Sequence, residues 1–348
     1  MTAASQPAMS FSRETFAKLS PHPYLLAHLQ PPSTASAPVR ANGRSSQECR
    51  GPHINNGSLT HAEGSALIRV GDTTAVCGVR SEILLASDVP GYRVDKSSTS
   101  SGSNCNELQE LDLLVPNIEL ATGCSPSFLP GQSPSVLAQS LSTRIYSLIH
   151  SCRIIDPDDL RIWYYPPGIS EGLQAGEEDL EAVEPEVKAF WTLYIDILFI
   201  SLDGNPFDAA WAAVLSALKD VRLPYAYWDI DREMILCSDE LSRSKKLKIR
   251  GLPIASTYAV FRAKEQAPIQ RAKEKYWVLA DPDAFEESLC DETVTMIVDS
   301  SSSRGSRILG ISKYGGVMIG KEEMKAIMST AERKWKGWSK IITSTAAT

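Results

Sequence analysis

NGRSSQECRGPHINNGSLTHAEGSALIRVGDTTAVCGVRSE, residues 42–82, is the stretch of this chain that decides its fold. Residues 65–70 and 73–79 are runs of apolar or β-branched side chains, and Gly71-Asp72 separates them. A glycine in the first central position fits a type II′ turn, the tight turn that joins two antiparallel strands. The pattern therefore predicts a β-hairpin, preceded by a charged, turn-rich segment that contains NGR and ECR.

The composition is that of an ordinary globular protein. The chain has 348 residues, of which 43% are hydrophobic and 22% are charged, and this is enough for a full core. Its formal net charge is -7, whereas free-standing nucleic-acid binders are usually basic, so any RNA contact must come from a local patch. The seven cysteines are scattered and include no CxxC pair. We therefore expect no metal site, no disulfide framework and no cofactor.

Patterning divides the chain into parts. We expect a short N-terminal helix, broken at Pro21 and Pro23, ahead of a Pro- and Ser-rich linker. Groups of strands followed by a helix then occur twice, which favours an α+β fold with two similar βα halves. The predicted parts are 1–39 (helix and linker), 40–230 (first part of the main domain, with an acidic insertion over 166–186), 251–320 (C-terminal subdomain) and 321–348 (C-terminal helix and tail).

Apolar spacing predicts three longer helices. The first has Ser133 as a candidate N-cap and Pro134 at its first position, and the second covers 203–220 with Asn205 as N-cap. The third covers 321–338, where Trp335 is expected in the core and Trp338 is left open between core packing and partner docking. The predicted inward residues of the first helix are Val136, Leu137, Leu141, Ile145, Leu148 and Ile149. Predicted strands include 111–115, 161–165, 190–202, 225–231, 254–261, 276–280, 293–298 and 307–313.

Three blocks carry a resemblance to a known family. They are the opening block at 42–82, LDGNPFDAAWAAVLSALKDVRLP at 202–224, and the segment from VLADPDAFEESLC to ILGISKYGG at 278–316. In this order they resemble the RNase PH family. The resemblance implies the RNase PH fold (ribosomal protein S5 domain 2-like), with two βα halves in one compact unit. The family contains both phosphate-dependent 3′-exoribonucleases and inactive ring subunits of the RNA exosome, and FAKLSPHPYLLAHL at 16–29 resembles ring subunits of the non-catalytic archaeal type.

The segment ahead of the first long helix favours the inactive kind. In active members the resemblance implies an Arg-rich segment here, because arginines hold the attacking phosphate. CSPSFLPGQSPS, residues 124–135, has no Arg or Lys, and the next basic residue is Arg144. We therefore expect no catalytic residues and no enzymatic activity. The alternative is an active phosphate-dependent 3′-5′ exoribonuclease, and a small-molecule kinase is disfavoured because no phosphate-binding loop is present.

Two acids keep a family-like spacing. Asp281 and Glu287 resemble the acidic pair of active members, and we interpret them as degenerate active-site acids. The competing interpretation is structural, since Asp281-Pro282-Asp283 is also an ordinary turn and helix start with Asp281 as the cap.

One basic run, SRSKKLKIR at 242–250, contrasts with the acidic chain. It can be a solvated loop or a contact for phosphates. The candidate RNA-binding residues are Arg144, Lys245, Lys246, Lys248 and Arg250.

The resemblance also implies partners. We expect other RNase PH-type ring subunits, cap proteins with OB-fold and KH domains, an associated exosome nuclease and RNA, without a membrane. Different paralogues would close the ring through heterologous interfaces, in an order that the sequence leaves open. The implied location is the nucleus, nucleolus and cytoplasm.

Overall fold

The computed structural model describes residues 12–31, 38–90, 92, 107–131, 134–165, 185–263, 276–290, 292–302, 305–316 and 318–345. Of the predicted acidic insertion, all but 185–186 lies outside these ranges. Within them, no helix combines the length and the apolar character needed to cross a membrane.

The first sheet contains the predicted hairpin. β2 (Gly64–Val70) and β3 (Thr73–Leu85) pair antiparallel, and Gly71 between them has a φ of 61°, which glycine adopts without strain. β1 (Pro52–Asn56), β4 (Leu114–Leu120), β5 (Arg161–Tyr164) and β6 (Glu186–Ser201) complete the sheet, in the order β1-β2-β3-β6-β4 with β5 also on β6. The strand predicted at 111–115 begins later, at Leu114, because the short helix α3 (Glu107–Glu110) precedes it.

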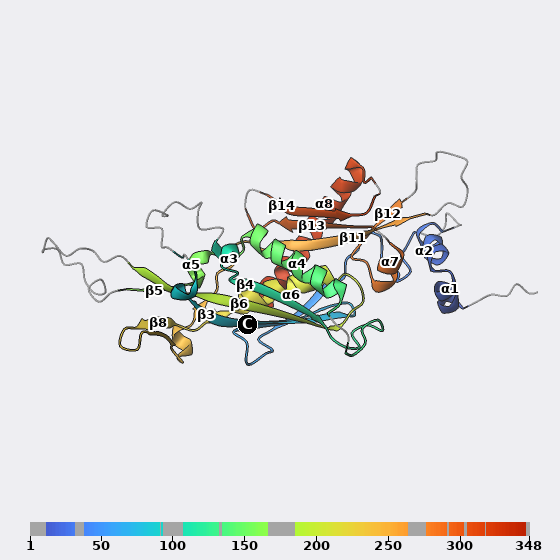
Figure 1. Ribbon diagram of the computed structural model, residues 1–348. Helices are drawn as coiled ribbons and strands as arrows, with labels where there is room; N and C mark the ends of the chain where they lie inside the picture. The colour runs from blue at the N-terminus through green and yellow to red at the C-terminus, as the bar shows by residue number, and fades with distance from the viewer. Residues whose placement is uncertain are drawn as a thin grey trace, which may run out of the picture.

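Two helices lie between this sheet and a second one (Figure 1). In α6 (Pro206–Asp220) every residue from 206 to 218 is buried, since the first sheet and β11 of the second cover its two sides. In α4 (Val136–Cys152) the predicted cap is wrong by two residues. Ser135 caps the helix, with its Oγ accepting the Ala138 N–H at 3.1 Å. Because the helix starts later, Val136 and Leu137 are exposed, whereas the other four predicted inward residues are buried.

The second sheet is antiparallel. Its order is β12 (Tyr276–Ala280), β11 (Ile254–Arg262), β13 (Glu292–Asp299) and β14 (Arg307–Tyr314), and α7 (Ala284–Leu289) follows β12. α8 (Lys321–Thr345) packs against β11 and β13 and reaches β1 of the first sheet. It continues beyond the predicted end at 338, and Trp338 is buried in the main core while Trp335 is half-buried beside it. That core also contains residues of both sheets, so the two halves form one unit.

The N-terminal residues pack on the second sheet. α1 (Arg13–Leu19) and α2 (Pro21–Leu29) are separated at Ser20, as the proline at position 21 predicts. Pro23 does not break α2, because it lies in the first turn, where its missing N–H costs no hydrogen bond. Leu25 of α2 is fully buried against Phe261 of β11 and its neighbours.

Several small elements complete the structure. They are η1 (Ala86–Asp88), α5 (Pro157–Leu160), β7 (Arg222–Leu223), β8 (Ala226–Asp229), β9 (Met234–Cys237), η2 (Leu241–Arg243) and β10 (Lys245–Lys246). β8 pairs with β9, and β10 pairs with β7, which makes part of the basic run a short strand.

Candidate functional site

The segment ahead of α4 lies beside the start of α6. The Leu202 N–H donates to the Cys124 carbonyl at 3.0 Å, next to Asp203. Asp203 in turn accepts from the Ala284 N–H at 3.4 Å, at the start of α7. Gly204, with a φ of 72°, allows this approach, because a Cβ there would lie 2.4 Å from the Asp283 carbonyl carbon. Through these two contacts, the start of the arginine-free segment at Cys124 is linked to the turn and helix that carry the acidic pair.

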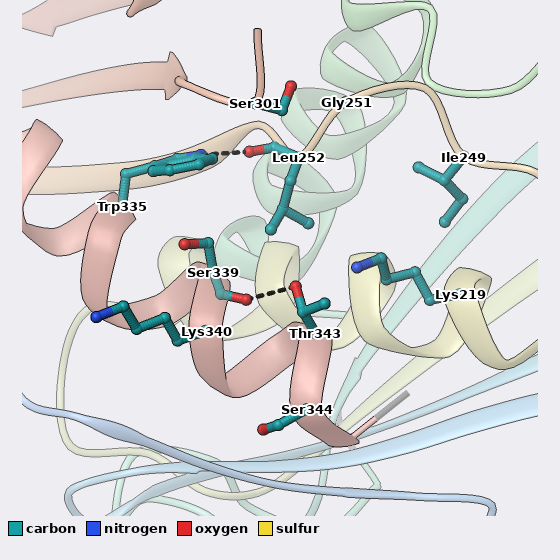
Figure 2. A pocket seen from close by; sticks show the side chains of 10 residues that line it. All are labelled: Lys219, Ile249, Gly251, Leu252, Ser301, Trp335, Ser339, Lys340, Thr343 and Ser344. Atoms are coloured by element: carbon teal, nitrogen blue, oxygen red, sulfur yellow. Dashed lines mark hydrogen bonds between the residues drawn. The ribbon is translucent and has the colours of Figure 1, made fainter. Parts of the chain in front are cut away.

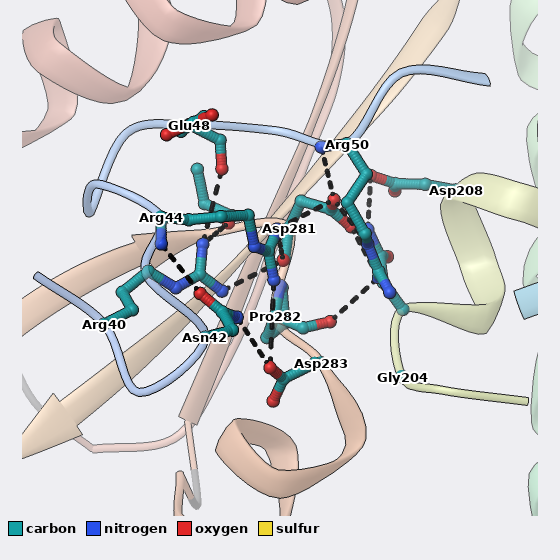
Figure 3. Close-up of polar contacts among 12 residues, drawn as sticks. Arg40, Asn42, Arg44, Glu48, Arg50, Gly204, Asp208, Asp281, Pro282 and Asp283 are labelled. Atoms are coloured by element: carbon teal, nitrogen blue, oxygen red, sulfur yellow. Dashed lines mark hydrogen bonds and ion pairs between the residues drawn. The ribbon is translucent and has the colours of Figure 1, made fainter. Parts of the chain in front are cut away.

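Asp281 is buried in a set of arginine contacts (Figure 3). Arg50 binds it through both carboxylate oxygens, with Nε 2.9 Å from Oδ2 and Nη2 3.0 Å from Oδ1. Arg44 Nη1 lies 3.3 Å from Oδ2, and the Asn205 amide donates to Oδ1 at 2.7 Å. Burial alone would raise the pKa of Asp281, but the Arg50 hydrogen bonds and the nearby Lys334 and Arg50 charges hold it well below its usual range.

The helix cap at this turn is Asp283 and not Asp281, contrary to the structural interpretation of the sequence. The Asp283 side chain accepts the Glu286 N–H at 2.9 Å, and the Glu286 carboxylate accepts the Asp283 N–H at 3.1 Å, a capping box. Asp281 instead has a φ of 50° and points at the arginines. Arg40 and Glu286 form a further pair with both side chains fully buried.

Carboxylates also occupy the start of α6. The Asn205 N–H donates to Glu287 Oε1 at 2.7 Å, so this acid takes an amide that a bound anion would use. Asn205 is the N-cap residue, as predicted, but its side chain binds Asp208 and Asp281 instead of capping. Burial raises the pKa of Glu287 to about 7.

Asp208 in the first turn of α6 is the centre of a second buried network. Its carboxylate accepts from Lys334 Nζ at 2.5 Å and from Thr257 Oγ1 at 2.7 Å. The four cations at this site are therefore all paired with acids: Arg40 with Glu286, Arg44 and Arg50 with Asp281, and Lys334 with Asp208. We call these seven residues, together with Asn205 and Glu287, the arginine–acid cluster. Its ion pairs and hydrogen bonds hold together segments that are distant in the sequence.

Comparison with known proteins identifies this architecture. The family model for the 3′ exoribonuclease family, domain 1 (RNase PH), matches residues 48–224. The exosome complex component rrp43 of Schizosaccharomyces pombe is 32% identical over 329 residues, which is 94% of this chain and 97% of that protein. The chain belongs to the RNase PH family.

Other RNase PH relatives and structures agree. The exosome complex component Rrp42 of Thermococcus gammatolerans is 26% identical and covers 87% of this chain and 89% of its own length. A structure of the Archaeoglobus fulgidus exosome with RNA bound to the active site aligns with a TM-score of 0.59 at 23% identity, over 90% of this chain and 95% of that one. An archaeal exosome core aligns with a TM-score of 0.57 at 20% identity, over 96% and 99%. The predicted family and its α+β fold are confirmed. Within that family, this sequence resembles the ring subunit called ribosomal RNA processing protein forty-three, and the name of the fission yeast relative agrees.

Arg144 of α4 lies against α6 and β13 of the RNase PH fold, apart from the basic run. Its guanidinium is 3.9 Å from the centroid of the Phe207 ring, and its Nη2 donates to Thr295 Oγ1 at 3.1 Å. Burial lowers the pKa of Arg144. The side chain is half-buried, so RNA would reach only part of it.

The basic run lies beyond the C-terminal end of α4. Lys245 Nζ is 2.7 Å from Asp159, and Arg250 pairs with Asp156. Lys246 and Lys248 are exposed. Both interpretations of the run therefore stay open, and its residues remain predicted RNA contacts.

Sequence reasoning missed most of the arginine–acid cluster. Asp281 and Glu287 were indicated by their spacing. Arg44 and Arg50 lie in the quoted NGR and ECR motifs, but the sequence analysis assigned no role to them. Lys334 gave no signal, because nothing local relates a helical lysine to an acid 126 positions earlier.

Proposed function

We propose that this chain is a non-catalytic ring subunit of an RNA exosome, which scaffolds the channel that guides RNA 3′ ends for 3′-to-5′ processing and degradation. The proposal is supported by relatives that are named as exosome components and that align over most of this chain. RNA turnover and ribosomal RNA processing are the processes that this role serves.

The proposed loss of activity rests on the lack of cations that could bind phosphate. Phosphorolysis needs cations that hold inorganic phosphate against the 3′-terminal phosphodiester. The segment at 124–135 supplies no Arg or Lys, and each of the four cations of the arginine–acid cluster already faces a carboxylate. A phosphate placed there would have to displace a buried acid.

The proposed partners follow from the same role. They are other RNase PH-type ring subunits, cap proteins with OB-fold and KH domains, an associated exosome nuclease and RNA. The proposed location is the nucleus, nucleolus and cytoplasm.

The test is a phosphorolysis assay joined to a native pull-down. The purified chain is incubated with single-stranded RNA and inorganic phosphate, with an active RNase PH enzyme as the positive control. We expect no nucleoside diphosphate above background, and co-purification of homologous ring subunits from cells. Diphosphate release that disappears in Glu287→Gln would contradict the non-catalytic role.

The second candidate is an active phosphate-dependent exoribonuclease, and one observation favours it. The pKa of Glu287 is raised to about 7, which suits a general acid at neutral pH. This candidate predicts release of nucleoside diphosphates that depends on phosphate, which the same assay measures.

A further inference from the structure

A shallow pocket lies away from the arginine–acid cluster, between α8, the end of α6 and the loop before β11 (Figure 2). Its volume is about 680 Å³. The floor is apolar and is formed by Ile249, Leu252 and Trp335. Two lysines, Lys219 and Lys340, and several hydroxyl groups complete the lining, which contains no acid.

Within the described part of the chain, the two lysines of the pocket have no acidic partner. Neither Lys219 nor Lys340 forms a hydrogen bond or ion pair with any residue that the structure describes. Lys219 is half-buried, and burial and the nearby Lys246 charge both lower its pKa. Figure 2 shows its ammonium end directed toward Thr343 across the pocket. An anion bound there would relieve this unpaired charge.

The pocket lies beside the basic run. Ile249, which lines it, belongs to residues 242–250, and the charge of Lys246 in that run is close enough to Lys219 to lower its pKa. An extended anion that binds Lys219 would therefore lie near further positive charge, which suits a polyanion better than an isolated ion.

Trp335 supplies a fixed aromatic surface. Its Nε1–H donates to the Leu252 carbonyl at 2.8 Å, which holds the ring edge in place while part of the side chain stays exposed. Aromatic rings of this kind stack with nucleic-acid bases of any sequence.

The hydroxyl groups of the pocket suit the donors of a nucleotide. Thr343 Oγ1 donates to the Ser339 carbonyl at 2.6 Å, and Ser344 Oγ donates to the Ile341 carbonyl, so both oxygens are left as acceptors. A base and a ribose 2′-hydroxyl bring donors to such groups, whereas an acidic peptide could donate only through its backbone N–H groups, because its carboxylates only accept. The volume is also sufficient for one nucleotide.

We propose that this pocket binds one nucleotide of a single-stranded RNA, with the base against Trp335 and the phosphates on Lys219 and Lys340. The proposal rests on the RNA-handling role given above and names a contact surface for it. Because the lysines touch only phosphates, binding is independent of base sequence.

The test measures binding of a short labelled oligouridylate to the full chain, co-purified with its ring partners, by fluorescence anisotropy. The double variant Lys219→Gln/Lys340→Gln should bind about tenfold more weakly, and its salt slope should fall by about 0.7 for each phosphate that the protein no longer binds. Lys336→Gln, an exposed lysine on α8 outside the pocket, is the matched control and should bind as the unmodified chain does. Lys219→Arg, which keeps the charge, should retain most of the affinity.

Two outcomes would overturn the proposal. One is unchanged RNA affinity and salt slope in the double variant. The other is loss of poly-glutamate binding with RNA binding intact, which would assign the pocket to an acidic protein segment. Co-purification of ring subunits is measured on the same samples. A loss of RNA binding at the pocket is thereby distinguished from a loss of association with the ring.

Discussion

Asp281 shows what a single side chain contributes in this molecule. It accepts from Arg50 on the N-terminal segment and from Asn205 at the start of α6, while its own backbone belongs to the turn after β12. Its φ of 50° is unusual outside glycine, although aspartate is among the residues that tolerate it best. One carboxylate therefore fixes three segments against each other.

Removal of Arg50 should destabilise the fold strongly. Arg50→Ala leaves the Asp281 carboxylate buried with its main cationic partner gone, and breaking such a pair costs about 3–5 kcal/mol. Arg69→Ala, which breaks the exposed pair with Asp72, is the control and should change the free energy of unfolding by less than about 0.5 kcal/mol. Denaturant titration measures both. A cost below about 1 kcal/mol for Arg50→Ala would show that the pair is not structural.

Glu287 should make stability fall as pH rises. Its folded pKa of about 7 lies above the ordinary value of 4.5, so the folded state holds a proton that the unfolded state has lost between these pH values. Stability from this group is full below pH 4.5 and is lost as pH rises through 7. The lowered pKa of Asp281 changes the stability only under more acidic conditions, so it does not affect the pH range in which Glu287 titrates.

The measurement compares the unmodified chain with Glu287→Gln at pH 5 and pH 8. The Gln side chain stays neutral and can still accept from Asn205, so the variant should gain roughly 1–3 kcal/mol relative to the unmodified chain as the pH rises. A difference between the two proteins that is independent of pH would contradict the raised pKa.

The candidate site could be predicted from the sequence only in part. The spacing of Asp281 and Glu287 and the missing arginines at 124–135 are visible in the chain itself. The partners of Asp281 are not, because Arg50 is 231 positions away and only the packed fold brings the two together.

Elements were predictable where the signal is local. The hairpin around Gly71 followed from a turn that glycine suits and from runs of β-branched and apolar side chains, and both are properties of neighbouring residues. The cap of α4 was missed because serines stand on both sides of Pro134, and propensity does not separate them. The basic run at 242–250 is partly the strand β10, which no residue pattern indicated.

The basic run should contribute to RNA binding without reading sequence. Lys245→Ala/Lys246→Ala/Lys248→Ala should weaken binding of the assembled complex about equally for different RNAs, and the salt slope should fall by up to roughly 0.7 for each phosphate released from a lysine. Because Lys245 already faces Asp159, we expect its share to be smaller than that of the exposed Lys248. Filter binding at several salt concentrations measures this. Unchanged affinity and slope would assign the run to a solvated outer face.

At the scale of the whole molecule, the layering followed from the order of the elements. Two groups of strands, each followed by a helix, predicted an α+β unit, and the main core does span both sheets. What the order could not show is which surfaces are left open. β14 is an edge strand of the second sheet, and it exposes Ile308, Ile311 and Tyr314.

This surface should make the chain depend on partners. Exposed apolar side chains on an unpaired edge favour association, so the chain expressed alone should be poorly soluble or self-associated, and co-expression with a ring paralogue should restore a defined complex. Ile311→Lys should reduce both self-association and paralogue binding, as size-exclusion chromatography measures. A stable monomer that is indifferent to paralogues would count against ring membership.

The distance along the chain between Arg50 and Asp281 also determines when their ion pair can form during synthesis. A ribosome that adds roughly 5–20 residues per second needs about 10–50 s to make the 231 residues between the arginine and its acid. Until then Arg40, Arg44 and Arg50 lack the acids that pair with them in the finished protein, and Lys334, the partner of Asp208, is made later still. The arginine–acid cluster can therefore be completed only after most of the chain has been made, and a message truncated ahead of codon 334 would yield a product in which Asp208 lacks its lysine partner.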